Sequence, residues 1–106
     1  MSRIVLTADD NGSTRRIRIG DVIELRLDEN PTTGYRWTLP SPDPAIIVIE
    51  DDAFARAGQG IGSGGERTIL MSAHGQGRAR LECEQVRSWE PDQPISRFSV
   101  TIVIDA

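Results

Sequence analysis

The sequence contains one cysteine, Cys83, and one histidine, His74. A single cysteine cannot form an intrachain disulfide, and these two residues cannot supply the clustered ligands of a structural zinc site. The net charge is −4, and the basic residues form no cluster that could neutralise a run of phosphates. We therefore expect no disulfide, no metal site and no nucleic-acid partner.

Long apolar runs are also absent. No segment approaches the roughly 20 apolar residues that a membrane-spanning helix needs, and the apolar stretch before Asp9 is too short for a secretory signal. We expect a soluble protein with no membrane partner, cytoplasmic as written, or periplasmic or secreted if a signal peptide has been removed. A chain of 106 residues predicts a single domain over residues 1–106, here a monomer.

No segment shows a convincing helical period, whereas apolar and polar residues alternate with period two along much of the chain. Turn-forming segments rich in Gly, Pro, Asn and Asp separate the alternating stretches. Seven strands are predicted, at residues 17–19, 23–27, 35–39, 46–49, 68–73, 79–83 and 98–104. This spacing indicates an all-β fold, an immunoglobulin-like β-sandwich of about seven strands without a disulfide.

Covalent catalysis requires a nucleophile beside a base, and the sequence offers no credible pair. Cys83 lies on the apolar face of its strand, which favours a buried structural thiol, and His74 lies in the exposed turn "HGQG". The pairs Asp9/Asp10 and Asp51/Asp52 are interpreted as solvated loop charges. We expect a protein that is not an enzyme and needs no cofactor.

The segment "GIGSGG" matches G-x-G-x-x-G through Gly60, Gly62 and Gly65. That pattern binds dinucleotides only where the glycines open a helix, and here a strand-like segment follows. We treat the match as accidental. The segment is either a flexible hairpin connection or, because glycine backbones can approach another surface closely, a binding loop.

The segment "NPTTGYRW", residues 30–37, lies between two predicted strands and carries a stiff, uncharged turn. Pro31 fixes its own φ and biases Asn30 toward extended geometry, while Gly34 permits a positive φ. The turn is thus preorganised, with small threonine hydroxyls at its tip. Tyr35 and Trp37 are predicted mainly as core supports for the turn.

The third unusual segment is "VRSWEPDQP", residues 86–94, which we predict as a loop stiffened by its prolines. Trp89 falls within this loop and off any alternating face. It is either an interface anchor, as exposed tryptophans often are, or a cap that folds back over the edge of the core. In an immunoglobulin-like sandwich the three unusual segments can gather at one end and form one neutral surface.

These segments resemble the chagasin-like inhibitors of papain-family cysteine peptidases. "NPTTGYRW" is similar to that family's first signature, "GSGG" to its glycine loop, and "SRFSVTIVI" to its last strand. "RSW" stands where the family usually has Arg-Pro-Trp, so Ser88 is a departure that leaves the loop freer. The order and spacing agree over nearly the whole chain.

The resemblance implies reversible, non-covalent inhibition by three loops that enter the active-site cleft as a wedge. They are the first loop (residues 30–35), the second (60–66) and the third (86–91). The first would cover the catalytic cysteine, and the others would grip the walls. The implied contact residues are Asn30, Pro31, Thr32, Thr33, Gly34, Gly62, Gly64, Gly65, Arg87 and Trp89.

A second function class is an immunoglobulin-like adhesion or carbohydrate-binding module. Such a module presents aromatic side chains on a flat strand face, whereas the candidate aromatic here, Trp89, lies on a loop. Titration of papain with the protein distinguishes the two classes, because only an inhibitor removes activity stoichiometrically.

Overall fold

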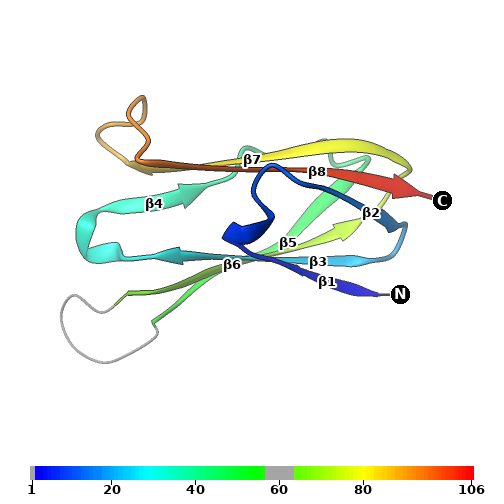
Figure 1. Cartoon of the computed structure of the whole chain (residues 1–106), viewed down its shortest axis with the longest axis horizontal. Coiled ribbons are helices and arrows are strands. Elements are labelled where there is room, and N and C mark those ends of the chain that lie inside the picture. Colours follow the sequence, from blue (N-terminus) through cyan, green and yellow to red (C-terminus); the bar gives the residue numbers. More distant parts are fainter. Residues whose placement is uncertain (1, 57–63) are drawn as a thin grey trace.

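The computed structural model describes residues 2–56 and 64–106. These residues form eight strands and two short 3-10 turns, and the strands make two four-stranded sheets that face each other (Figure 1). The predicted all-β, immunoglobulin-like sandwich is confirmed. The described part of the chain holds no helix with the length and apolar character to cross a membrane.

The first sheet has the strand order β1-β3-β6-β5. Its strands are β1 (Arg3–Leu6), β3 (Val22–Glu29), β6 (Gly65–Ala73) and β5 (Ile47–Arg56). β1 runs parallel to β3, and the other two pairings are antiparallel. The carboxyl end of β3 therefore lies beside the start of β6.

The second sheet has the strand order β2-β8-β7-β4. Its strands are β2 (Thr14–Arg18), β8 (Ser96–Asp105), β7 (Gly77–Arg87) and β4 (Tyr35–Thr38). β2 runs parallel to β8, whereas β7 is antiparallel to both β8 and β4. β4 is short and lies at the edge of this sheet. It begins at Tyr35, directly after the first loop.

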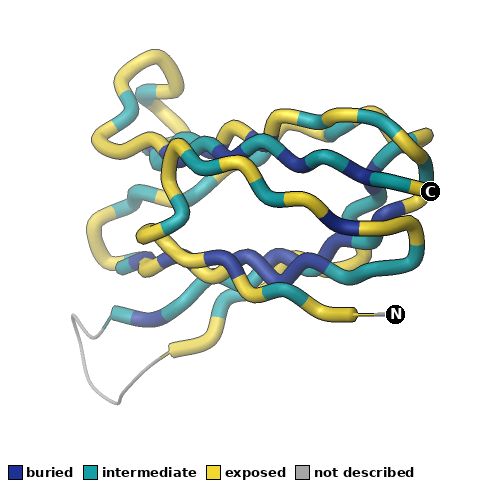
Figure 2. The backbone as a smooth tube through the Cα atoms, turned by 45° about the vertical axis from the view of Figure 1, so that its right-hand side comes forward, coloured by how far each residue is buried: buried dark blue, intermediate teal, exposed yellow. Residues whose placement is uncertain are grey.

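The core lies between the sheets, and buried residues alternate with less buried ones along the central strands (Figure 2). It includes Ile23, Leu25, Leu27, Ile69, Met71, Leu81, Cys83, Phe98, Val100, Ile102 and Ile104. Cys83 is 1% exposed, as predicted, and its burial raises the pKa of the thiol to about 12. The thiol is therefore neutral near pH 7, which leaves it without the thiolate that a reactive cysteine needs.

Three features of the strands differ from the prediction. β1 was not predicted, because four residues show too little alternation to separate them from a loop. Ile19, predicted on the same face as Ile17, lies beyond the end of β2 and is 46% exposed, since the chain turns at Gly20 with a φ of 94°. β5 continues past Ile49 to Arg56 through a register shift. This extension was not predicted, because an edge strand whose residues are exposed on both faces shows no apolar alternation.

The two ends of the sandwich carry different parts of the chain. Both termini lie at one end, and the turn between β3 and β4 lies at the other, together with the connection between β7 and β8 (Figure 1). The first and third unusual segments therefore share one end of the molecule, as predicted from the topology of an immunoglobulin-like sandwich.

Candidate functional site

The first loop contains the 3-10 turn η2 (Pro31–Thr33), which is closed by its own side chains. The side-chain oxygen of Asn30 accepts hydrogen bonds from the Thr32 amide at 3.1 Å and the Thr32 hydroxyl at 2.7 Å. The Thr33 hydroxyl donates to the Asn30 carbonyl at 2.8 Å. Asn30 is extended and Gly34 has a φ of 81°, so the predicted preorganised turn is confirmed.

The threonines lie at the exposed tip, and their hydroxyl protons are engaged within the turn. The oxygen of Thr33 also accepts a hydrogen bond from the Tyr35 amide at 3.2 Å. The Thr32 hydroxyl donates internally, so its oxygen keeps acceptor capacity toward a partner. The tip thus offers an uncharged hydrogen-bond acceptor.

The third loop begins later than predicted, because Val86 and Arg87 belong to β7. β7 outlasts its pairing with β8 and continues against β4, where Arg87 pairs with Tyr35. The chain then reverses in a turn, in which the Glu90 amide donates to the Arg87 carbonyl at 3.0 Å. Ser88 occupies the second position of this turn, where proline is favoured.

Trp89 is 66% exposed, so the alternative in which it caps the core is wrong. Its indole lies against the first loop: a Cβ added to Gly34 would fall 2.7 Å from a Trp89 ring carbon. Gly34 therefore serves two purposes, since it adopts a positive φ and leaves room for the indole. The contact brings the first and third loops together.

Arg87 connects the same two loops. Its Nε donates to the Thr33 carbonyl at 3.1 Å, and its guanidinium lies 4.3 Å from the centroid of the Tyr35 ring. The guanidinium is also 5.6 Å from the Trp89 ring and 3.4 Å from a carboxylate oxygen of Glu90. Tyr35 thus supports Arg87, whereas Trp37 packs against the core as predicted.

The described part of the second loop lies on the side of the first loop that faces away from the third loop. Gly65 is buried at the start of β6 and pairs with Glu29 of β3. A Cβ at Gly65 would lie 2.3 Å from the Ala55 carbonyl and 2.6 Å from the Phe54 ring, so packing alone requires glycine there.

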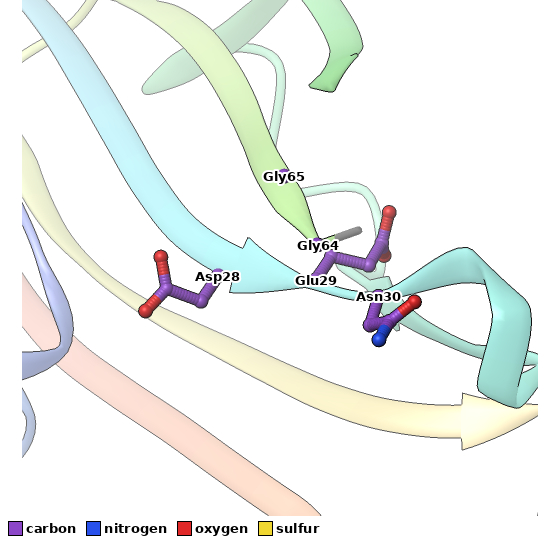
Figure 3. A pocket seen from close by; sticks show the side chains of 5 residues that line it. All are labelled: Asp28, Glu29, Asn30, Gly64 and Gly65. Atoms are coloured by element: carbon purple, nitrogen blue, oxygen red, sulfur yellow. The ribbon is translucent and has the colours of Figure 1, made fainter. Parts of the chain in front are cut away.

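Gly64 lies beside Glu29 at the base of the first loop, and a shallow groove of about 500 Å³ lies there (Figure 3). The groove is lined by Asp28, Glu29, Asn30, Gly64 and Gly65. Gly62, predicted as a contact, lies with residues 60–63 outside the described residues. Ten contact residues were predicted, and the structure gathers the nine described ones at one end of the sandwich.

The structure adds a charged pair that the sequence analysis missed. The Glu29 side chain is 1% exposed, and one of its oxygens lies 2.8 Å from a terminal nitrogen of Arg67. The other terminal nitrogen of Arg67 lies 2.8 Å from Asp52, which is exposed as predicted but lies in strand β5 and is paired, not in a loop. The hydrogen bond to Glu29 raises the pKa of the Arg67 guanidinium.

The signal for this pair was present in the sequence. Glu29 continues the inward series Ile23, Leu25 and Leu27, so a carboxylate stands where the alternation calls for an apolar residue. An acid on a core face requires a buried partner, but the alternation does not say which residue supplies it. Within residues 2–56 and 64–106, no cluster of His, Cys, Asp and Glu is arranged to hold a metal ion.

Residues 16–102 match the model of the chagasin family peptidase inhibitor I42. The chain is similar to chagasin of Trypanosoma cruzi, with 28% identity over 101 residues that cover 90% of this chain and 92% of chagasin.

Solved structures that share the fold include two protease inhibitors. A cysteine protease inhibitor from Entamoeba histolytica has a TM-score of 0.89 at 22% identity, over 98% of this chain and 96% of that one. PbICP-C, solved in complex with falcipain-2, has a TM-score of 0.72 at 14% identity, over 99% of this chain and 100% of that one.

Proposed function

The chain belongs to the chagasin family of cysteine peptidase inhibitors, and we propose that its first, second and third loops form the surface that enters the peptidase cleft. We call this surface, residues 30–35, 60–66 and 86–91, the three-loop end. The protein is an inhibitor and not an enzyme. Its partners are cysteine peptidases of the papain family.

One observation carries the assignment of the surface: the first and third loops contact each other and present a single exposed aromatic. Trp89 is the one large aromatic that is exposed in the described part of the chain, and it lies against Gly34 at the tip of the first loop. An exposed tryptophan beside a stiff turn has little freedom to lose on binding. This combination favours an anchor for a partner surface.

The chemistry of the first loop suits the centre of a cysteine peptidase cleft. Such a cleft holds a thiolate and an imidazolium, and the Thr32 oxygen can accept a hydrogen bond without bringing in a charge that must be desolvated. Cys83, the single thiol of the sequence, is buried in the core, so it is not available to form a mixed disulfide with the catalytic cysteine. The proposed inhibition is non-covalent and reversible.

The same loop resists cleavage because residues 31–33 form a closed 3-10 turn rather than an extended segment. Three hydrogen bonds from threonine side chains and amides hold this turn. A peptidase that closed on Thr32 or Thr33 would have to break them before the scissile bond could be aligned.

Titration of papain during substrate turnover tests the proposal. We expect stoichiometric loss of activity that is competitive with substrate and is recovered on dilution, with the inhibitor intact by mass spectrometry. Fragments cut at Thr32 or Thr33, appearing as activity returns, would mean that the protein is a slow substrate. No loss of activity would instead favour an adhesion or carbohydrate-binding module.

A further inference from the structure

A buried ion pair lies directly beneath the first loop. Glu29 is the residue before Asn30, and its carboxylate is almost completely enclosed, with 1% of the side chain exposed. It accepts hydrogen bonds from the Trp37 amide at 2.7 Å and from Arg67 Nε at 3.0 Å. The carboxylate therefore contacts two elements that are distant in sequence.

These contacts join both ends of the first loop to the strand that leads out of the second. Glu29 ends β3 and Trp37 lies in β4, so their hydrogen bond closes the base of the loop across eight residues. Arg67 lies in β6 two residues after Gly65, and its second partner, Asp52, lies in β5. One carboxylate thus sets how the first loop sits relative to the β5–β6 pair.

Burying a charge here is not the simplest way to stabilise the sandwich. An apolar residue at position 29 would extend the series of Leu25 and Leu27 without the cost of desolvating a carboxylate. A carboxylate instead supplies directional hydrogen bonds, which fix an angle as well as a distance. A glutamate at position 29 is therefore better suited to orienting the first loop than to stabilising the core.

We propose that Glu29 is a positioning residue for inhibition, whose pairing with Arg67 and Trp37 holds the first loop at the orientation in which the flanking loops engage the peptidase together. The inference deepens the proposed function and rests on it. Glu29 itself does not touch the peptidase, because its side chain is enclosed. Its effect reaches the partner only through the placement of residues 30–34.

The first test is Glu29→Gln, which keeps the shape and the acceptor for the Trp37 amide but removes the charge that pairs with Arg67. At a temperature well below melting, we expect the inhibition constant against papain to rise about tenfold, as for the loss of a buried charged hydrogen bond. Unchanged inhibition by the folded variant would overturn the proposal, because a purely structural pair affects melting alone.

Two further variants separate orientation from stability. Ile104→Ala removes a core side chain from β8 at the end that carries the termini, and it should lower the melting temperature without changing inhibition. Asp52→Asn removes only the outer partner of Arg67, whose side chain is 48% exposed, so we expect about a twofold effect. Equal loss of inhibition in Ile104→Ala would overturn the proposal.

The double variant Glu29→Gln/Arg67→Leu decides the question even if Glu29→Gln folds poorly. It leaves no unpaired buried charge, so the melting temperature should rise back toward that of the unsubstituted protein. The link from the first loop to β6 is still lost. We expect inhibition to stay about tenfold weaker than in the unsubstituted protein. Full inhibition by this variant overturns the positioning role, whereas a failure of the unsubstituted protein to inhibit overturns the proposed function itself.

Discussion

The body of the sandwich and its three-loop end are held together by different interactions. In the body, buried apolar side chains from both sheets form one continuous core. At the loop end, the described residues are connected by hydrogen bonds within η2, by the contacts of two arginines and by one exposed tryptophan. Apolar burial is non-directional, whereas hydrogen bonds and ion pairs fix orientation. Stability and inhibition should therefore depend on different residues.

The two arginines of the loop end show the same contrast on a smaller scale. The side chain of Arg67 is 16% exposed and is held by Glu29, whereas that of Arg87 is 34% exposed and lies between aromatic rings. The first loop is thus connected to the body of the sandwich through Arg67 and to the third loop through Arg87.

The largest expected effect at the loop end comes from Trp89→Ala. Loss of an interface aromatic should weaken binding by about 2–4 kcal/mol, mainly through faster dissociation, while the melting temperature barely changes because the ring is mostly exposed. Inhibition kinetics and a melting curve on the same preparation check both. A variant that melts early yet inhibits fully when folded would remove Trp89 from the contact surface.

The matching change in the body is Cys83→Ser. A hydroxyl in this apolar site should lower the free energy of unfolding by about 1–3 kcal/mol, because it is poorly satisfied there. Inhibition by the folded variant should stay the same. Denaturant titration and the papain assay measure the two quantities, and a folded variant that no longer inhibits would show that the thiol contributes to function.

Gly34→Ala tests both regions at once, with Gly12→Ala as the matched control. Both glycines have a φ of 81°, so each substitution should cost about 1–2 kcal/mol of stability through backbone strain. Only the Cβ at Gly34 meets Trp89, since nothing lies within 4 Å of the one at Gly12. We expect weaker inhibition from Gly34→Ala alone; an equal loss from Gly12→Ala would contradict the loop contact.

Alkaline pH should affect the body through Cys83. Burial raises the pKa of the Cys83 thiol to about 12 in the folded protein. Below the ordinary value of about 8.5 the thiol is protonated in both the folded and the unfolded chain, so its full contribution to the free energy of unfolding is present. As pH rises further, the unfolded chain loses this proton first, and stability should fall by up to about 1.4 kcal/mol per pH unit. Denaturant titrations from pH 8 to 11 should show this decline in the unsubstituted protein, and a smaller one in Cys83→Ala.

The smallest expected effect comes from Ser88→Pro. Ser88 is the second residue of the turn closed by Arg87 and Glu90, a position that suits the fixed φ of proline. A stiffer third loop has less freedom to lose, so binding should tighten by up to about 1 kcal/mol. Papain inhibition constants for the two proteins decide this, and weaker binding would show that the loop must adjust on contact.

The local sequence was sufficient to predict those features of the structure that neighbouring residues determine. The alternation over residues 98–104 and 79–83 predicted strands and placed Cys83 inward. The chemistry of proline and glycine predicted the turn at residues 30–34, because a fixed φ, an extended residue before it and a left-handed glycine act within five residues. The three segments of the loop end were recognised from the same short patterns.

Only the tertiary structure decided what those segments contact. The register of β4 against β7 extended β7 to Arg87, and the pairing of β3 with β1 created a strand where four residues show too little pattern. Glu29 and Arg67 are 38 residues apart, and Thr33 and Arg87 are 54 apart. Sheet register brings such partners together, and no local pattern contains it, because each strand's periodicity specifies which face is buried but not which residue of another strand lies opposite.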